Sequence, residues 1–580
     1  MRVTHLCCLL ALPAIACSAD RAAPTAPADR DVHAFVNPPP AASVTVPVNV
    51  PASMQSAPFN VTRFLTIPPN FAIAVYTRIA GARFMAVAPN GDLLVAVPGS
   101  GKVVLVRPNG SGNPLISDFV TGLAKPHDIV FHPIGATTYL YIAEKNQINR
   151  YAYTNGDLTG QNRQIILSGL PDESSPGLGG TYGHVLKNIA LDSNDKLYVS
   201  IASTCNVCLN DTQSNPVRGA IYQYNADGTG GVLFARGLRN AEGLAMLPGT
   251  TTLWAIVNNR DDIPYPFNDG SGNYGQVITS YVDNHPPEEF TRVRSGGNYG
   301  WPFCNPNPDS ATGYVNMPFD LDYNLNQNGS VNCASMDRIS MGIQAHSAPL
   351  GLLFLQNTAV PAAYQPGAVA GLHGSWNRSQ KTGYKVIYFP WDNGSQLPAT
   401  PINLVTGWLQ GGSEWGRPVD IAVNGAGDFL ISDDASGTIY KMTYTAGPPP
   451  PPSDTTYEAE MATLHGAVIK SNQAGFTGTG FVHYVNATGD YIEWTFTVPA
   501  TDDYNLSFRY GLKSGTRSLA VAVNGVTVVP SFAFAATGSL TTWKRIKITR
   551  ALTAGPVSLR LSTTGQSGPN VDNVRVFLAP

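Results

Sequence analysis

The sequence has little charge, little helical periodicity and few cysteines. Charged residues make up only 13% of its 580 residues, and the formal net charge is −3. No basic stripe is visible, so nucleic acid is not an expected partner. Outside the N-terminus, no segment sustains the apolar period of a helix. Glycine (57) and proline (46) are both abundant and both favour turns, so the sequence predicts an all-β chain of many short strands.

The N-terminus has the features of an export signal. Arg2 precedes an apolar stretch, Leu6–Ala16, which ends in a small-x-small cleavage site and is too short to span a bilayer. Residues 1–19 are therefore predicted to be a signal peptide, and the protein to be periplasmic, outer-membrane-anchored or extracellular. Cleavage before Cys17 would leave a lipid anchor there, although Ala14 stands where such signals usually have Leu. A lipoprotein and a freely secreted form both remain open.

Four cysteines remain in the mature part: Cys205, Cys208, Cys304 and Cys333. An even number in an exported protein predicts two disulfides. Of the three pairings, proximity in sequence favours Cys205–Cys208 and Cys304–Cys333. Cys208 is followed by Leu209 rather than His, so this is not a c-type haem site. We prefer the interpretation that Cys205–Cys208 is a structural disulfide that holds a loop together, and a redox-active dithiol is the alternative.

The chain is too long for one ordinary core, which predicts two or three domains. Residues 20–57 are rich in Ala, Pro, Val and Ser with little periodicity, and we expect a disordered tether there. Residues 446–454 contain five consecutive prolines, which favour a stiff linker of about 3 Å per residue. Alternating strands then fill residues 455–580, which predicts a β-sandwich of jelly-roll type.

One pattern recurs six times between about residues 80 and 445. A polar residue precedes an apolar strand, a turn with Asn, Asp or Gly, and a second apolar strand. Repeats of this length with several strands each are typical of propeller blades. We therefore expect a six-bladed β-propeller over residues 58–445, with insertions mainly between residues 258 and 345.

The residue before the first strand of each repeat lies, in a propeller, at one mouth of the central channel. Cations and imidazoles occupy these places, which predicts a convergent, positively charged pocket. The alternative is that each residue only caps its own turn. The residues are Arg83, His127, His184, Arg239 with Asn240, His346 and Arg417.

Several motifs in order resemble the PQQ-dependent sugar dehydrogenases of the soluble glucose/sorbosone dehydrogenase group and their pyranose dehydrogenase relatives. The resemblance covers roughly residues 65–445. It rests on the motifs Gly183-His184-xx-Lys187, Gly237-Leu-Arg239-Asn240-Ala-Glu242-Gly243, Asn259-Arg260-Asp261-Asp262, Asn298-Tyr299-Gly300-Trp301-Pro302, Ala348-Pro349-Leu350-Gly351, His373-Gly374-Ser375-Trp376-Asn377-Arg378 and Arg417-Pro418-Val419-Asp420 through Ser432-Asp433-Asp434.

The resemblance implies a cofactor and roles for residues. PQQ has three carboxylates, which Arg and Lys can bind, and an electrophilic quinone. His184 would be the general base that takes the proton of the substrate hydroxyl, with Arg239 beside it. The cofactor would contact Arg83, Lys187, Arg239, Asn240, Arg378, Lys385 and Arg417. The substrate would contact His127, Asn240, Trp301 and Trp376.

Calcium is the second implied cofactor, because it polarises the quinone as a Lewis acid. Asp261 and Asp262 lie where the relatives hold this ion, and a solvated turn is the alternative. This sequence departs from some members of the family at two positions where contacts to the cofactor are expected. Some relatives have Arg in place of Lys187, and some have Gln in place of Glu242, whose carboxylate would repel the cofactor unless it is paired.

Residues 455–578 resemble carbohydrate-binding modules of the family 6/35 type, through the motifs Tyr457-Glu458-Ala459-Glu460 and Asn570-Val571-Asp572-Asn573. Since the first and last strands of such a sandwich pair, Glu458, Glu460 and Asp572 are expected to meet and to hold a structural Ca²⁺. The candidates for contacts to sugar are Tyr491, Arg517, Trp543 and Asn570, and a core position is the alternative for Trp543.

Together these features predict an exported PQQ- and Ca²⁺-dependent dehydrogenase. It would oxidise a sugar hydroxyl of an aldose, sorbosone or pyranose, and electrons would pass to an external quinone or cytochrome. The C-terminal module would hold the enzyme on polysaccharide. Two alternatives are a Ca²⁺-dependent propeller lactonase or hydrolase, and a non-catalytic glycan-binding protein.

Overall fold

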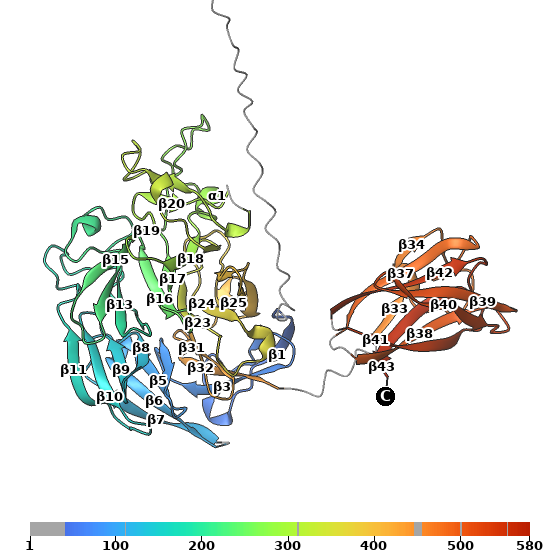
Figure 1. Cartoon of the computed structure of the whole chain (residues 1–580), viewed down its shortest axis with the longest axis horizontal. Helices are drawn as coiled ribbons and strands as arrows, with labels where there is room; N and C mark the ends of the chain where they lie inside the picture. Colours follow the sequence, from blue (N-terminus) through green and yellow to red (C-terminus); the bar gives the residue numbers. More distant parts are fainter. Residues whose placement is uncertain are drawn as a thin grey trace, which may run out of the picture. The chain divides into compact units, whose positions relative to one another are not determined.

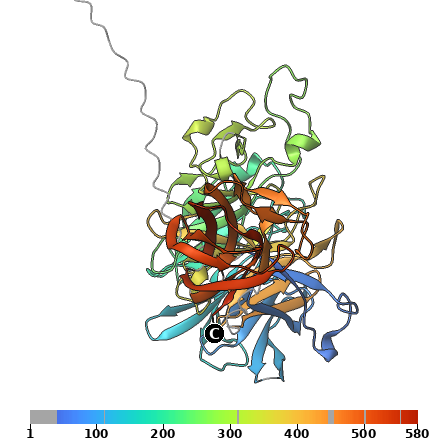
Figure 2. The same cartoon turned by 90° about the vertical axis from the view of Figure 1, so that its right-hand side faces the viewer.

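The computed structural model describes residues 41–445, apart from 111, 310 and 311, and residues 455–579, apart from 499–501 and 554. The predicted signal peptide, Cys17, the first part of the predicted tether and the linker lie outside the described residues. The described part is almost entirely β, with one short α-helix, α1 (Thr279–Val282) (Figures 1 and 2). None of the described helices is long and apolar enough to cross a membrane.

Six sheets of four or five strands succeed one another within described residues 71–444. The first contains β4 (Met85–Val87), β5 (Leu93–Val97), β6 (Lys102–Asn109) and β7 (Gly112–Val120); the second β8 (Ile129–Ile134), β9 (Thr137–Ala143), β10 (Ile148–Tyr153) and β11 (Gln161–Leu167); the third β12 (Ile189–Leu191), β13 (Lys196–Ile201), β14 (Ala220–Asn225), β15 (Val232–Arg236) and β19 (Gly297–Asn298). The fourth contains β16 (Asn240–Met246), β17 (Leu253–Asn258), β18 (Glu288–Val293) and β22 (Met341–Ile343); the fifth β23 (Pro349–Phe354), β24 (Gly367–Leu372), β25 (Lys385–Asp392), β26 (Leu397–Pro398) and β27 (Ile402–Val405); the sixth β30 (Pro418–Val423), β31 (Phe429–Asp433), β32 (Thr438–Tyr444) and β3 (Phe71–Arg78). All six predicted repeats coincide with these sheets.

The first strands of the six sheets contact one another in a ring. The order of contacts is β4, β8, β12, β16, β23, β30 and back to β4. The sheets approach closely where the strands carry glycine: a Cβ on Gly243 would lie 2.4 Å from the carbonyl oxygen of Leu350. Glycine is required there because any side chain would push two neighbouring sheets apart.

Two interactions close the ring between the last sheet and the first. The early strand β3 pairs with β32, so the sixth sheet is built from both ends of this part of the chain. The buried Asp420 carboxylate of β30 accepts a hydrogen bond from the backbone N–H of Met85 in β4 at 2.8 Å. The Asp128 side chain likewise accepts a hydrogen bond from the backbone N–H of Ile189 in β12 at 2.9 Å. Burial raises the pKa of Asp420 to about 8 and that of Asp128 to about 7.

The predicted tether is shorter than residues 20–57. β1 (Val44–Pro47) pairs with β2 (Phe64–Ile67), and Val48 is buried in the core. The physical reason is the alternation of Val44, Val46 and Val48, which presents apolar side chains with the period of a strand.

Both predicted disulfides, Cys205–Cys208 and Cys304–Cys333, are confirmed. The second ties together the long insertion after β17, since Cys304 begins β20 (Cys304–Pro306), which pairs with β21 (Phe319–Leu321). Two further short strands, β28 (Leu409–Gln410) and β29 (Ser413–Glu414), form a hairpin before β30. Short 3-10 segments lie at Ala52–Met54, Pro98–Ser100, Asn210–Gln213, Thr312–Tyr314, Cys333–Ser335, Ala362–Tyr364 and Ala459–Met461.

Residues 455–578 form two antiparallel sheets with one shared core. One sheet contains β33 (Thr455–Glu458), β35 (Val468–Lys470), β36 (Phe481–His483), β38 (Asp502–Gly511), β41 (Lys544–Leu552) and β43 (Asn570–Leu578). The other contains β34 (Thr463–His465), β37 (Thr488–Val498), β39 (Thr516–Val523), β40 (Val526–Ala535) and β42 (Gly555–Thr564). The predicted pairing of the first and last strands is confirmed as β33 with β43.

Replacing both cysteines of the Cys304–Cys333 bridge with alanine is expected to lower the free energy of unfolding by about 3–4 kcal/mol, because the bridge spans 29 residues. The Cys205–Cys208 bridge spans only 3 residues, so its loss is expected to lower that free energy by only about 2 kcal/mol. Urea unfolding of the two variants and the parent protein measures both effects. Equal destabilisation by the two replacements would contradict this loop-length account.

Candidate active site

Polar residues are predicted at one mouth of the ring. In the structure they come shortly before the first strand of each of the six sheets. Arg83 is two residues before β4, His127 two before β8, and Arg239 immediately before β16. His184, His346 and Arg417 precede β12, β23 and β30 by five, three and one residues. Hydrogen bonds and ion pairs connect most of these residues across different sheets.

The first such connection joins the first, fifth and sixth sheets through Asp434. Its carboxylate binds Arg83 at 2.5 Å and the Nε2 of His373 at 2.8 Å. Arg417 donates to the carbonyl oxygens of His373 at 3.0 Å and Gly374 at 3.3 Å. Burial lowers the pKa of His373, so this imidazole is neutral at pH 7 and donates to Asp434.

A second connection joins the second and fourth sheets. The Nε2 of the fully buried His127 lies 3.0 Å from the Glu242 carboxylate, which also accepts from Asn240 Nδ2 at 3.2 Å. Although burial opposes ionisation, the hydrogen bond from His127 lowers the pKa of Glu242 to about 2. Burial lowers the pKa of His127, so a neutral imidazole faces a carboxylate. The Glu242 carboxylate is therefore hydrogen-bonded inside the protein, but the neutral His127 does not cancel its negative charge.

Arg239 is held on several sides by backbone and side-chain oxygens. It donates to the carbonyl oxygens of Asn259 at 2.6 Å and Asn206 at 3.2 Å, and to Asn206 Oδ1 at 3.0 Å. Asp261 lies 3.7 Å from it. Burial lowers the pKa of Arg239 to about 10, which still leaves it charged at pH 7.

Asn206 joins the elements around Arg239. Besides its two contacts to Arg239, its side chain accepts from the backbone N–H of Asp261 at 2.8 Å and donates to the Asp261 carbonyl at 2.7 Å. Its carbonyl oxygen also accepts from Trp301 Nε1 at 3.2 Å. The sequence analysis did not predict a role for Asn206. Its position between Cys205 and Cys208, whose bridge fixes the loop, was the one feature that could have pointed to such a role.

His184 has a defined tautomer. Its Nδ1 lies 3.0 Å from both the carbonyl oxygen and the hydroxyl of Ser203. Because the carbonyl can only accept, we assign the proton to Nδ1, which donates it there. The lone pair is therefore on Nε2. Burial, followed by the positive charge of Arg239, lowers the pKa of His184 to about 4. His184 is consequently a neutral imidazole with a basic nitrogen at pH 7.

The predicted metal ligands of this domain are engaged elsewhere. The Asp261 carboxylate lies near Arg239 and 3.4 Å from His346 Nδ1, and the Asn377 amide, in the orientation that satisfies both of its groups, pairs with Asp262. Burial opposes a charge on His346, but its hydrogen bond to Asp261 raises its pKa. Asp262 is exposed. Among the described residues, no three His, Cys, Asp or Glu side chains are grouped so that they could hold a metal ion.

Three predicted cofactor contacts lie outside these connections. Lys187 is fully buried and donates to the Val185 carbonyl at 2.5 Å, and burial lowers its pKa to about 7. Arg378 donates to the carbonyl oxygens of Asp283 and Gln380, next to α1. Lys385 is half-buried at the start of β25, and burial lowers its pKa. Lys187 is therefore buried within the protein and does not line an open pocket.

The two predicted substrate tryptophans differ in exposure. Trp301 is 4% exposed and packs beside Asn206, whereas Trp376 is 71% exposed on the loop after β24. Only Trp376 has a free ring face that a sugar could stack on. The buried position of Trp301 follows from its closeness to Gly219, where a Cβ would lie 2.6 Å from the indole ring.

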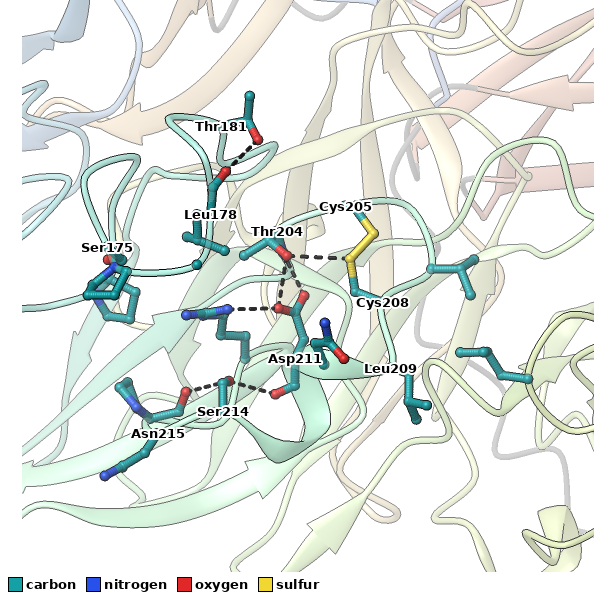
Figure 3. Close-up of a pocket in the computed structure, with 18 of the residues that line it drawn as sticks. Ser175, Leu178, Thr181, Thr204, Cys205, Cys208, Leu209, Asp211, Ser214 and Asn215 are labelled. Atoms are coloured by element: carbon teal, nitrogen blue, oxygen red, sulfur yellow. Dashed lines mark hydrogen bonds and ion pairs between the residues drawn. A yellow bond between two sulfur atoms is a disulfide. The ribbon is translucent and has the colours of Figure 1, made fainter.

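Two cavities adjoin these residues. One of about 240 Å³ lies between the first strands of the ring, where Asp128, Gly243 and Asp420 contribute to its wall. The other, of about 920 Å³, includes Thr204 and the Cys205–Cys208 bridge (Figure 3). Asp211 accepts hydrogen bonds from the backbone N–H and the hydroxyl of Thr204, at 2.7 and 2.8 Å. These interactions, drawn as dashed lines in Figure 3, fix the loop that carries Asn206.

In the C-terminal domain, the three predicted carboxylates lie near one another, although their described side chains are not grouped closely enough to hold a metal ion. Thr477 donates to Glu458 at 2.8 Å and lies 3.0 Å from Asp572, which also accepts from Arg509. A Cβ on Gly478 would lie 2.2 Å from Glu460 and 3.1 Å from the Glu458 side chain. The Glu460 Oε2 atom is buried without a hydrogen-bond partner in the described structure.

Three of the four predicted sugar contacts lie near one end of β38. Gly511 pairs with Asn570 and packs against the Trp543 ring, and Arg517 binds Ser567, in the loop before Asn570. Tyr491 lies apart, on the outer side of the other sheet, stacked against His465 and covered by Arg560. Trp543 is half-buried and donates to the Ala474 carbonyl at 2.9 Å.

Both domains are similar to parts of known proteins. The chain is 25% identical over 404 residues to an uncharacterized protein of Borreliella burgdorferi, which covers 68% of this chain and 94% of that protein. It is 40% identical over 131 residues to an exo-beta-D-glucosaminidase of Amycolatopsis orientalis; this covers 22% of the chain and only 13% of the glucosaminidase. The chain thus spans about an eighth of the length of the glucosaminidase.

Two solved structures share the fold of the larger domain. The Trichoderma reesei enzyme of carbohydrate-active family AA12 is 19% identical, with a TM-score of 0.54, over 66% of this chain and 97% of that one. The holo form of the pyranose dehydrogenase PQQ domain from Coprinopsis cinerea is also 19% identical, with a TM-score of 0.54, over 65% and 97%.

Family models match both parts of the chain. Residues 455–578 match the carbohydrate binding module of family 35, which confirms the predicted type of the sandwich. The TrAA12-like model matches residues 67–445, well over half of the chain, and the protein therefore belongs to the TrAA12-like family.

Proposed function

We propose that the protein is an exported PQQ-dependent dehydrogenase that oxidises a sugar hydroxyl, and that its six sheets are the blades of a propeller. The observation that carries the proposal is the neutral His184, with its Nε2 lone pair available, beside the fixed cation Arg239. The same family and fold in a pyranose dehydrogenase PQQ domain support the choice of cofactor.

The residues at the mouth fit an anionic cofactor. Arg83, Arg239 and Arg417 all lie there, and the buried Arg83 Nε has no hydrogen-bond partner in the described part of the chain. When bound, PQQ supplies a quinone that accepts a hydride. Arg83 and Arg417 would bind its carboxylates, since guanidinium groups match carboxylates in a bidentate geometry.

The protein's own part in the reaction is proton transfer and positioning. His184 Nε2 would accept the proton of the substrate hydroxyl, because its Nδ1–H is already donated to Ser203. Arg239 would stabilise the negative charge that develops on oxygen next to it, since it remains charged while its position is fixed by Asn206 and Asn259. Trp376 would offer its exposed ring to the sugar.

In the larger domain, only the family resemblance supports a calcium ion. Asp261 is occupied by Arg239 and His346, so the described side chains of this domain give it no ready site. In the module, the unpartnered Glu460 Oε2 beside Glu458 favours a cation that stabilises the fold. The module itself would bind polysaccharide near Trp543, Arg517 and Asn570 and keep substrate close. Electrons would pass to an external acceptor.

Reconstitution tests the proposal. The full chain, freed of metals and cofactors, is mixed with PQQ, with or without Ca²⁺, and reduction of a dye is followed across a set of sugars. We expect dye reduction only with PQQ. The variant His184→Gln is expected to lower kcat about 10²–10⁴-fold, as loss of a general base does. The matched variant His465→Gln, on the exposed surface of the module, is expected to keep full activity. Absence of PQQ binding, or an unaffected His184→Gln, would refute the proposal.

The pH dependence of kcat/KM tests the state of His184. A base must lose its proton to work, so activity is lost as the pH falls through the pKa of the free enzyme's base. Because burial lowers the pKa of His184 to about 4, kcat/KM for a neutral sugar is expected to persist at pH 5 and to fall near pH 4. A fall centred at the ordinary histidine value of about 6.5 would contradict the buried, neutral state.

Asn206 is expected to act by positioning. Asn206→Ala removes the side-chain contacts to Arg239 and Asp261, and kcat/KM is expected to drop about 100-fold, as for a small misplacement of a catalytic group. The control is Asn210→Ala, which changes an exposed asparagine of the same loop. Circular dichroism and thermal unfolding verify that both variants fold. Equal activities of the two variants would show that Asn206 does not position Arg239.

A further inference from the structure

The two disulfides of the larger domain differ in exposure. Cys205 is exposed and Cys208 is half-buried. Cys304 and Cys333 are only 1% and 7% exposed. A disulfide is cleaved by a thiolate that must reach one of its sulfur atoms. The Cys205–Cys208 bridge is therefore open to thiol–disulfide exchange in the folded protein, whereas the Cys304–Cys333 bridge is shielded.

The cavity of about 920 Å³ gives access to the exposed bridge. Both Cys205 and Cys208 lie in its wall (Figure 3). The charged residues that the described wall contains, Asp211 and Arg218, form an ion pair at 3.2 Å. An approaching thiolate therefore meets no uncompensated carboxylate in this wall that would repel it. The volume of the cavity admits a small dithiol at the bridge.

Thr204 lies beside the sulfur atom that would leave in such an exchange. Its Oγ1 is 3.4 Å from Cys208 Sγ and 2.8 Å from the Asp211 carboxylate. Attack on the exposed Cys205 releases Cys208 as a thiolate next to this hydroxyl, which can rotate and donate a hydrogen bond to it. Because a stabilised thiolate leaves faster, the surroundings favour attack at Cys205 and departure of Cys208.

The bridge encloses Asn206, the residue that holds one side of Arg239. Asn206 Oδ1 accepts from Arg239 at 3.0 Å and from the backbone N–H of Asp261 at 2.8 Å. The Asn206 carbonyl oxygen accepts from Trp301 Nε1 at 3.2 Å. These bonds require one conformation of the Asn206 backbone, and the small ring closed by the bridge restricts that backbone. Cleavage of the bridge therefore weakens the hold of Asn206 on Arg239.

The change on cleavage is expected to be local and reversible. The bridge spans only 3 residues, so few residues gain freedom when it opens. Outside the small ring, the Thr204 N–H still donates to Asp211 at 2.7 Å, and Arg239 still donates to the Asn259 carbonyl at 2.6 Å. The two cysteines thus stay close to each other and can form the bridge again.

We propose that Cys205–Cys208 is a thiol–disulfide exchange site that controls the position of Arg239. One thiolate of a dithiol reductant attacks Cys205 Sγ and forms a mixed disulfide, and Cys208 leaves as a thiolate that takes up a proton. The second thiol of the reductant then closes the reductant's own disulfide and releases Cys205 as a thiol. Two electrons and two protons pass from the dithiol to the protein, and Asn206 is loosened. The effect on activity rests on the proposed function, whereas the exchange itself does not.

The test reduces the full chain under native conditions. The cofactor-free protein is treated with dithiothreitol, desalted and then given PQQ, so that the reductant does not meet the dye. In a parallel sample, iodoacetamide labels free thiols for mass spectrometry. We expect label on Cys205 and Cys208 and none on Cys304 and Cys333. We expect kcat/KM for dye reduction to fall about tenfold and to recover after treatment with oxidised glutathione.

Hydrogen exchange supplies a readout that does not depend on activity. The Asp261 N–H is donated to Asn206 Oδ1, so a peptide that contains Asp261 is expected to exchange faster after reduction. The control is a peptide from β24, whose residues are all buried in the fifth sheet and whose exchange is expected to stay unchanged.

Two variants connect the bridge to Asn206. Cys205→Ser/Cys208→Ser is expected to have the low kcat/KM of the reduced protein and to be insensitive to dithiothreitol. Asn206→Ala is expected to lose little further activity on reduction, because the effect of the bridge acts through this residue. An additional loss as large as that of the parent protein would contradict this connection.

Three results overturn the proposal: no label on Cys205 and Cys208, label there with unchanged exchange at Asp261, or equal label on Cys304 and Cys333, which would indicate general unfolding. If the oxidised protein reduces no dye with PQQ, the dehydrogenase proposal fails. Labelling and hydrogen exchange still decide the exchange proposal in that case, so the two failures are distinguishable.

Discussion

Closure of the ring is the constraint on which the rest of the larger domain depends. β3 pairs with β32, so that Arg78 lies opposite Thr438, and the Asp420 carboxylate holds the backbone of Met85. Without the pairing of β3, β32 would be the unpaired edge strand of the sixth sheet and would be open to other chains. Closure also brings Arg83 to Asp434, residues from opposite ends of the domain, at the mouth where the candidate site lies.

Buried carboxylates also set the electrostatic character of the site. Three carboxylates, Asp434, Glu242 and Asp261, lie among the cations and imidazoles of the mouth, so the pocket is less positive than a list of its basic residues suggests. Burial keeps His184 neutral, while Arg239 remains charged. A neutral base next to a fixed cation is the pairing that removal of a proton from a hydroxyl requires.

The sequence predicted the repeats well because each contains two apolar strands around a polar turn, and all six coincide with sheets. It also predicted which residues precede the first strands, since that position follows from the repeat. It could not show that Trp301 is buried, that Arg378 faces Asp283, or that Asn206 joins Arg239 to Asp261. These facts depend on loops between strands, whose paths no local pattern specifies.

The central claim is that the mouth of the ring holds PQQ within reach of His184. The most direct measurement is a crystal structure of the full chain, or of its larger domain if that proves stable alone, soaked with PQQ. The account predicts quinone density within hydrogen-bonding distance of His184 Nε2 and Arg239, with carboxylates against Arg83 or Arg417. PQQ density confined to the 920 Å³ cavity beside Cys205–Cys208, or no density at saturating concentration with Ca²⁺ present, would contradict it.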